Sequence, residues 1–219
     1  MLQVLGSVTA NPVKDSLPKE LAIVVHDLSS ALPTHMMAIY SPETVGGAKK
    51  RKVTLFPAHS LILASHCAKL PPFSSSHALP NEEGSPQEIT IPIAPLCLPS
   101  PETYPYLSSY LYIKRTDLLL ESLLPDDLPR ELAKEGAQLL PFAAKLAGKF
   151  TAQLLLQHTM IVHGLWRNVC ALGVFDDNLW NAMDLAWEVL LTAIAIGTGN
   201  PQAMVGNLPA ESQAESSLS

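Results

Sequence analysis

The sequence predicts an α+β fold, with a small mixed β-sheet in the first half and a mainly α-helical C-terminal half. Short apolar stretches with strand-like alternation lie before residue 100, and from Thr116 onward the apolar residues recur at helical spacing. The chain has 219 residues, of which 47% are hydrophobic. We therefore expect one domain over residues 21–197, between a weakly ordered N-terminus at 1–20 and a disordered tail at 198–219.

Three stretches in the N-terminal part are candidate strands. Residues 21–25 are apolar and fit either a strand or one buried helical turn. Met36–Tyr40 is a second candidate, and Lys52–Phe56 is the strand that returns beside it, with Gly46 and Gly47 at the hairpin tip.

The strand at Lys52–Phe56 leads directly into a helix. Pro57 is expected to end the strand pairing, because proline has no N–H to donate. The helix is expected from about His59 to Ala68, with His59 as a structural side chain at the turn. Its predicted inner face contains Leu61, Ile62 and Cys67.

A polar connector over residues 71–86 should be an exposed loop. Glu88–Ile93 alternates as a further strand, and Pro92 should place it at an edge or limit its length. Ser100-Pro101-Glu102 is typical of a helix start. Because Pro105 cannot donate a backbone hydrogen bond, we expect the helix itself to begin nearer Tyr104.

From Thr116 onward the pattern predicts helices over residues 117–124, 130–140, 143–172 and 179–196. The apolar stripe of the long segment should face the core, and it consists of Leu155, Val162, Leu165, Val169 and Leu172. The last helix should begin at a cap formed by Asp176 or Asp177 and end at Gly197. Its predicted inner face consists of Trp180, Met183, Trp187, Leu190, Leu191 and Ile194.

Charge and cysteine content favour an intracellular protein. The net charge of −6 argues against direct nucleic-acid binding, which requires clustered positive charge. Three widely spaced cysteines fit reduced thiols, with Cys67 and Cys170 expected to be buried and inert. The N-terminus lacks a secretory pattern, and the longest apolar run is too short to span a bilayer, so we expect no membrane association.

The sequence contains no spacing that is typical of an active site. The histidines and cysteines do not follow a metal-binding pattern, and the nucleophile elbow, the P-loop and the Rossmann glycine pattern are all missing. We therefore expect no enzymatic activity, no catalytic residues, no cofactor and no metal.

Two groups of residues remain as candidate functional sites. The basic run Lys49, Lys50, Arg51 and Lys52 resembles a nuclear localisation signal on an exposed hairpin tip, and its alternative is a solvated loop that protects a strand edge. Three tryptophans are either core residues or anchors for a protein partner: Trp166, Trp180 and Trp187.

Two regions resemble BTB/POZ domains, in the order in which they occur there. Phe56-Pro57-Ala58-His59, followed by an apolar helix, resembles the strand-to-helix step of that family, and Tyr110-Leu111-Tyr112 resembles its later helix end. The resemblance implies a BTB/POZ-like core that binds other proteins. Thr34 and His35 stand where BTB domains often have an acidic residue at the first strand, so the sequence departs from the pattern linked to homodimerisation.

A narrower resemblance covers residues 35–196. The segment from Val162 to Trp180, continued by Met183–Leu190, is similar to the fungal clampless protein family. The resemblance implies a regulator of fungal sexual development that acts in clamp-cell formation and dikaryotic growth.

These resemblances imply a non-enzymatic module that binds transcription or cell-cycle regulators, in the nucleus, the cytoplasm or both. A substrate adaptor of a cullin ubiquitin ligase is the alternative, because many BTB proteins have that role.

Overall fold

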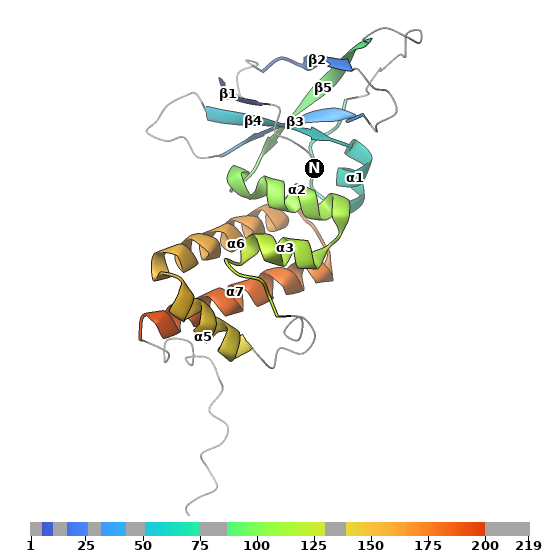
Figure 1. Ribbon diagram of the computed structural model, residues 1–219. Helices are drawn as coiled ribbons and strands as arrows, with labels where there is room; N and C mark the ends of the chain where they lie inside the picture. The colour runs from blue at the N-terminus through green and yellow to red at the C-terminus, as the bar shows by residue number, and fades with distance from the viewer. Residues whose placement is uncertain are drawn as a thin grey trace, which may run out of the picture. The chain divides into compact units, whose positions relative to one another are not determined.

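The computed structural model describes residues 6–10, 17–25, 32–42, 51–74, 87–129 and 139–199. The chain divides into two compact units, one made of residues 1–115 and 164–177 and the other of residues 116–163 and 178–219. The first unit contains the sheet, and the described elements of the second are helices (Figure 1). The predicted α+β class is therefore confirmed, while the single domain over 21–197 stays a prediction.

The sheet of the first unit has five strands in the order β1-β4-β3-β5-β2. The strands are β1 (Gly6–Ala10), β2 (Glu20–Val25), β3 (His35–Tyr40), β4 (Arg51–Ala58) and β5 (Gln87–Cys97). Strands β3 and β5 are parallel and the other neighbours are antiparallel, so the predicted mixed sheet is confirmed. The apolar stretch at 21–25 is a strand, and β1 lies within the N-terminal residues that were expected to be weakly ordered.

Strand β3 lies at the centre of this sheet. Four of its consecutive residues have no exposed surface, and they are Met36, Met37, Ala38 and Ile39. Because successive strand residues point to opposite faces, both faces of β3 are covered. Helix α2 (Tyr104–Ile113) packs on the sheet, with the rings of Phe56 and Tyr104 5.1 Å apart (Figure 1).

Strand β5 changes its pairing partner halfway along. Residues 87–92 pair with β2, and residues 93–97 pair with β3. The prediction that Pro92 places this strand at an edge or limits its length is wrong in both forms, because β5 lies between β3 and β2 and continues to Cys97. The Ile93 N–H donates to the Lys19 carbonyl beside β2. Because successive strand residues direct their backbone nitrogens to opposite sides, the nitrogen of Pro92 faces the β3 side. Pairing with β3 begins only at Ile93, so the missing N–H of Pro92 removes no bond there.

The expectation that Pro57 ends the pairing of β4 is also wrong. Pro57 pairs with Met36 inside the ladder, and β4 continues to Ala58. On the other side of β4, β1 pairs with residues 51–55 only, so proline's missing N–H removes no bond there.

Helix α1 (Ser60–His66) is shorter than the predicted helix. It ends because Cys67 becomes extended, with φ of −114°, and forms a β-bridge with Val174. Its inner side contains Leu63 and Cys67, four residues apart, while Leu61 is 80% exposed. The predicted inner position of Leu61 is therefore wrong.

A single 3₁₀ turn at Pro101–Thr103 precedes α2, which begins at Tyr104 as predicted. Helix α2 ends at Ile113, and Lys114 follows in the left-handed region with φ of 56°. Its N–H donates to the Tyr110 carbonyl at 2.7 Å, which closes the helix end.

The second unit contains α3 (Thr116–Leu123), α5 (Leu139–Lys149), the first part of α6 (Ala152–Leu172) and most of α7 (Asp177–Gly197). Residues 130–138, predicted as helix, lie outside the described residues. The prediction of one continuous helix over 143–172 is wrong, because the helical structure is interrupted between the end of α5 at Lys149 and the start of α6 at Ala152. Thr151 caps α6 there, since the Leu154 N–H donates to its hydroxyl oxygen at 3.3 Å.

The predicted apolar stripe of α6 is confirmed, since all five of its residues are buried. The buried face of α7 consists partly of other residues than predicted. Met183 and Leu190 are buried as expected, while Trp187 is 38% exposed. Small side chains occupy much of the observed buried face, and they allow close helix packing. The buried residues of α7 are Leu179, Ala182, Met183, Ala186, Val189, Leu190, Ala193 and Ala195.

Helix α7 is also long and apolar enough to cross a membrane, by length and composition alone. Because polar residues such as Asp184 and Glu188 interrupt it, α7 is not visible in the sequence as one long apolar run. Core helices of soluble proteins meet the same criteria, and much of α7 is buried in this structure.

Candidate protein-interaction surface

The predicted basic run is only partly described. Lys49 and Lys50 lie outside the described residues, while Arg51 and Lys52 open β4, where they pair with Ala10 and Thr9 of β1. Lys52 is exposed. Half of the run therefore belongs to a strand rather than to a hairpin tip.

The three candidate tryptophans are distributed over both units. Trp166 belongs to the first unit and is 44% exposed, whereas Trp180 and Trp187 belong to the second. Trp180 is half-buried, and the ring of Trp187 lies 6.2 Å from that of His163. Each tryptophan presents some apolar surface to solvent, and its contact with a partner stays a prediction.

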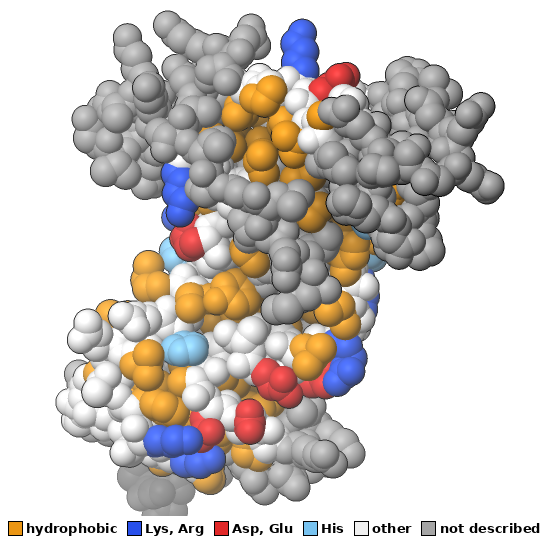
Figure 2. Space-filling view, turned by 45° about the horizontal axis from the view of Figure 1, so that its top comes forward, with side chains coloured by type: hydrophobic (Ala, Val, Ile, Leu, Met, Phe, Trp, Pro, Cys, Tyr) orange, Lys and Arg blue, Asp and Glu red, His pale blue; other side chains and the backbone are white. Residues whose placement is uncertain are grey.

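Exposed apolar side chains also occur on α6 in the second unit. Leu156 is 53% exposed and Met160, one helical turn later, is 59% exposed. His163 follows at the next turn and contacts Trp187. Figure 2 shows hydrophobic side chains reaching the molecular surface among polar ones.

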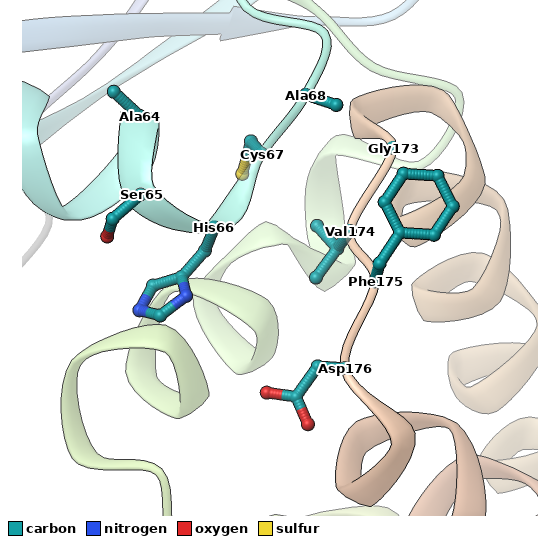
Figure 3. A pocket seen from close by; sticks show the side chains of 9 residues that line it. All are labelled: Ala64, Ser65, His66, Cys67, Ala68, Gly173, Val174, Phe175 and Asp176. Atoms are coloured by element: carbon teal, nitrogen blue, oxygen red, sulfur yellow. The ribbon is translucent and has the colours of Figure 1, made fainter.

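The first unit has a pocket of about 280 Å³ beside the end of α1. One wall is Ala64–Ala68 and the other is Gly173–Asp176 (Figure 3). The two walls are joined by backbone hydrogen bonds from the Ala68 N–H to the Gly173 carbonyl at 3.1 Å and from the Lys69 N–H to the Leu172 carbonyl at 2.9 Å. We call this site the α1 pocket.

Asp176 fixes the polar side of the α1 pocket. One oxygen of its carboxylate accepts a hydrogen bond from the Tyr110 hydroxyl at 3.1 Å, and the other lies 2.8 Å from the Lys114 ammonium. Burial and the bond to Asp176 raise the pKa of Tyr110 to about 12, so the phenol remains protonated. The sequence predicts Asp176 or Asp177 as the cap of α7, and Asp176 directly precedes that helix.

Two further groups lining the pocket are uncharged at neutral pH. The pKa of His66 is lowered, first by burial and then by the nearby Lys114. Burial raises the pKa of the Cys67 thiol to about 11, which agrees with its predicted inertness. Cys170 differs, because it is exposed on α6, so its predicted burial is wrong.

Two large hydrophobic residues near the pocket are exposed, which the sequence does not predict. Phe175 is 87% exposed and Leu61 is 80% exposed. Val174 is buried and points toward α1, whereas the Phe175 side chain lies on the opposite side of the segment, where it also lines the pocket (Figure 3). The exposure of Phe175 could have been predicted from the sequence, because neighbouring residues of an extended segment face opposite sides and Val174 faces inward.

His59 has a structural environment. Its backbone N–H donates to the Tyr112 hydroxyl at 2.8 Å, and its Nδ1 lies 3.0 Å from the same oxygen. These contacts join the start of α1 to α2. Among the residues that the structure describes, no three His, Cys, Asp or Glu side chains are grouped as metal ligands would be.

Comparison with known proteins relates this chain to one fungal family. The model of the Clampless protein 1 N-terminal domain matches residues 1–99, and that of the Clampless protein 1 C-terminal domain matches residues 117–218. Clampless protein 1 from two strains of Cryptococcus neoformans var. neoformans serotype D is 28% identical over 107 residues. The aligned region is 48% of this chain and 21% of each relative, so the chain matches only a part of those longer proteins.

No solved structure matches the chain, and the BTB/POZ resemblance is not confirmed. The family resemblance identified from Val162–Trp180 lies within the matched C-terminal region. Since the two domain models together account for most of the sequence, this chain belongs to the clampless protein family.

Proposed function

We propose that this chain is a non-enzymatic protein-interaction module that regulates clamp-cell formation and dikaryotic growth in fungi. The observation that carries the proposal is the match of both Clampless protein 1 domain models along the chain. Its partners are transcription or cell-cycle regulators, and it binds neither nucleic acid nor membranes directly.

The exposed apolar side chains support protein binding. Large aromatic residues with exposed surface are frequent anchors of protein interfaces, and Trp166, Trp187 and Phe175 all have such surface. Covering the apolar surface of an exposed Phe or Trp by a partner lowers the free energy of the complex.

Purification of the tagged chain from mating cells, followed by mass spectrometry, tests the proposal. We expect transcription or cell-cycle regulators to be recovered with the wild-type chain and to be reduced with Trp166→Ala or Trp187→Ala. Leu140→Ala is the matched control, because Leu140 is 63% exposed but is not a candidate anchor. Cullin subunits among the recovered proteins would favour the ubiquitin-ligase adaptor instead, and the absence of any specific partner would contradict the proposal.

A nuclear site of action follows if the basic run is a transport signal. Replacement of Lys49, Lys50, Arg51 and Lys52 by Ala should move a fluorescent fusion from the nucleus to the cytoplasm and leave it soluble. An unchanged distribution would contradict this role, and the run would then be a solvated segment at the edge of β4.

A further inference from the structure

We propose that the second unit binds a basic amphipathic helix of a partner protein, on a surface formed by the outer faces of α6 and α7. This binding rests on the protein-interaction role proposed above, to which it adds the place of contact and the chemistry of the partner.

Leu156 and Met160 form an exposed apolar row on α6. They are one helical turn apart, opposite the buried stripe of the same helix, and are 53% and 59% exposed. His163 continues the row, and its ring lies 6.2 Å from the ring of Trp187 on α7. The two rings are equally far from Phe175 along the chain, as expected for two helices that run back on each other from a short connection (Figure 1). The apolar surface therefore extends from α6 onto α7.

Two carboxylates flank Trp187 on α7. Asp184 precedes Trp187 by one helical turn and Glu188 follows it directly, and both are exposed. Neither forms an ion pair with a residue that the structure describes. We call the combined area the α6–α7 surface, and it consists of Leu156, Met160, His163, Asp184, Trp187 and Glu188.

The second unit carries the whole net charge of the chain, which is −6. Its residues include ten Asp and Glu against four Lys and Arg, whereas the first unit contains ten of each. Lys145 and Lys149 are the basic residues that the structure describes in the second unit, and both are paired with Asp126. The carboxylates of the α6–α7 surface therefore remain available to a positively charged partner.

The same charge disfavours other classes of partner. Phosphate groups make nucleic acids and anionic membranes negative, so the second unit repels both. A second copy of this chain fits no better. The Lys and Arg side chains of its described helices are Lys145, Lys149 and Arg167, and the two lysines are already paired.

The backbone of the α6–α7 surface favours a helical partner. Both elements are helices whose backbone groups are bonded internally, so they cannot pair with an added strand, and the partner must satisfy its own backbone groups. The row from Leu156 to His163 is about 10 Å long, which matches about two turns of a helix. A helix with an apolar stripe and Lys or Arg beside it would cover the row and meet Asp184 and Glu188.

Fluorescence anisotropy of the full chain with a defined probe tests the proposal. The probe is a labelled peptide of about 18 residues that places Leu on one helical face and Lys on the other, and the control peptide has Glu in place of Lys. We expect the Lys peptide to bind at least about tenfold more tightly than the Glu peptide. Its affinity should fall as the salt concentration rises.

Variants separate the apolar and the charged contributions. Trp187→Ala should weaken binding of the Lys peptide by about tenfold or more. Glu188→Lys should weaken it by about threefold or more at low salt and less at high salt.

The matched controls lie on α3 of the same unit. Leu118 is 41% exposed and Glu121 is exposed, so Leu118→Ala and Glu121→Lys repeat the loss of an apolar side chain and the charge reversal elsewhere. His158 points away from the exposed row of α6 and its Nδ1 lies 2.8 Å from the Leu123 carbonyl of α3, so α3 lies on the other side of α6. Both controls should bind the Lys peptide like the wild type.

Equal affinity for the two peptides, or losses in the α3 controls as large as those in Trp187→Ala and Glu188→Lys, would overturn the proposal. Binding of the chain to vesicles of phosphatidylcholine and phosphatidylserine that Trp187→Ala abolishes would also overturn it, because the surface would then be a membrane site. Circular dichroism spectra identical to that of the wild type confirm that the variants are folded.

Purification from mating cells distinguishes this surface from the developmental role. Specific partners that are recovered equally with the wild type and with Glu188→Lys and Trp187→Ala would overturn the α6–α7 surface and leave the proposed role intact. Loss of those partners with both variants, but not with the α3 controls, would support the surface.

Discussion

Asn168 and Ser100 are joined by a reciprocal pair of hydrogen bonds in the core of the first unit. The Ser100 N–H donates to the Asn168 side-chain oxygen at 3.0 Å, and the Asn168 amide donates back to the Ser100 carbonyl at 2.6 Å. The same amide also donates to the Thr103 hydroxyl at 2.9 Å, and Asn168 is completely buried. One side chain of α6 thus bonds the backbone of Ser100, directly before the 3₁₀ turn that leads into α2.

Asn168→Leu should therefore lower the free energy of unfolding. It leaves the buried Ser100 N–H without its partner, at roughly 1–3 kcal/mol, while the Ser100 carbonyl keeps its hydrogen bonds from the Thr103 N–H and hydroxyl. Urea denaturation measures the change, with Asn181→Ala as the control because Asn181 is exposed on α7. An Asn168 variant as stable as the control would show that the pair does not stabilise the unit.

Two glycines on helices should respond to alanine in opposite directions. Gly148 of α5 has open space around an added Cβ, so Gly148→Ala should raise the free energy of unfolding by up to about 1 kcal/mol through helix propensity. At Gly164 of α6 an added Cβ would collide with the Ser100 side chain and lie 2.9 Å from Thr103 Cγ2. Gly164→Ala should therefore lower stability, and equal effects at both sites in thermal unfolding would contradict this close approach.

The carboxylate of Asp126 should make stability depend on acid pH. Hydrogen bonds from Lys145, at 2.9 Å, and Lys149, at 3.0 Å, lower the pKa of Asp126 to about 2. A folded pKa below the unfolded value stabilises the protein above the unfolded pKa, and this stabilisation is lost as the pH falls from about 4 toward 2.

Asp126→Asn should consequently be less stable than the wild type near neutral pH, and the difference should shrink as the pH falls through that range. The effect should be modest, because both lysines are more than half exposed. Urea denaturation at a series of pH values measures it. Asp127→Asn is the neighbouring control, and a constant difference between Asp126→Asn and the wild type at all pH values would contradict the assignment.

The thiols should differ in reactivity. Cys67 is buried with its pKa raised to about 11, whereas Cys170 is exposed. Iodoacetamide should modify Cys170 in the native protein and reach Cys67 only after denaturant is added. Peptide mapping after timed labelling reads out each site, and equal native rates would show that the Cys67–Val174 bridge opens readily.

The sequence predicts the elements better than it predicts which side chains they bury. The strand at Met36–Tyr40 and the α6 stripe follow from periodicity, because burial on a regular element repeats at fixed intervals. Long-range pairing is not visible in such patterns. The bridge between Cys67 and Val174 ends α1 early, and it comes from residues that are far apart in sequence.

The same limit explains the candidate site. Leu61 has the character of a core residue, and its exposure follows from the orientation of α1, which Leu63 and Cys67 set by packing inward. On α7 the large tryptophans suggested the inner face, yet alanines such as Ala182 and Ala186 form it, because a close helix contact requires small side chains. The family, in contrast, could be identified from residues 162–180, since a specific order of residues distinguishes a family where periodicity does not.

Counting clamp cells at hyphal septa in a mating cross tests the proposed developmental role most directly. The cross compares partners that lack this chain with the same strains complemented by the wild-type chain. Our account predicts that clamp cells disappear in the deletion strains and return on complementation. Clamp cells at wild-type frequency in the deletion cross would contradict it.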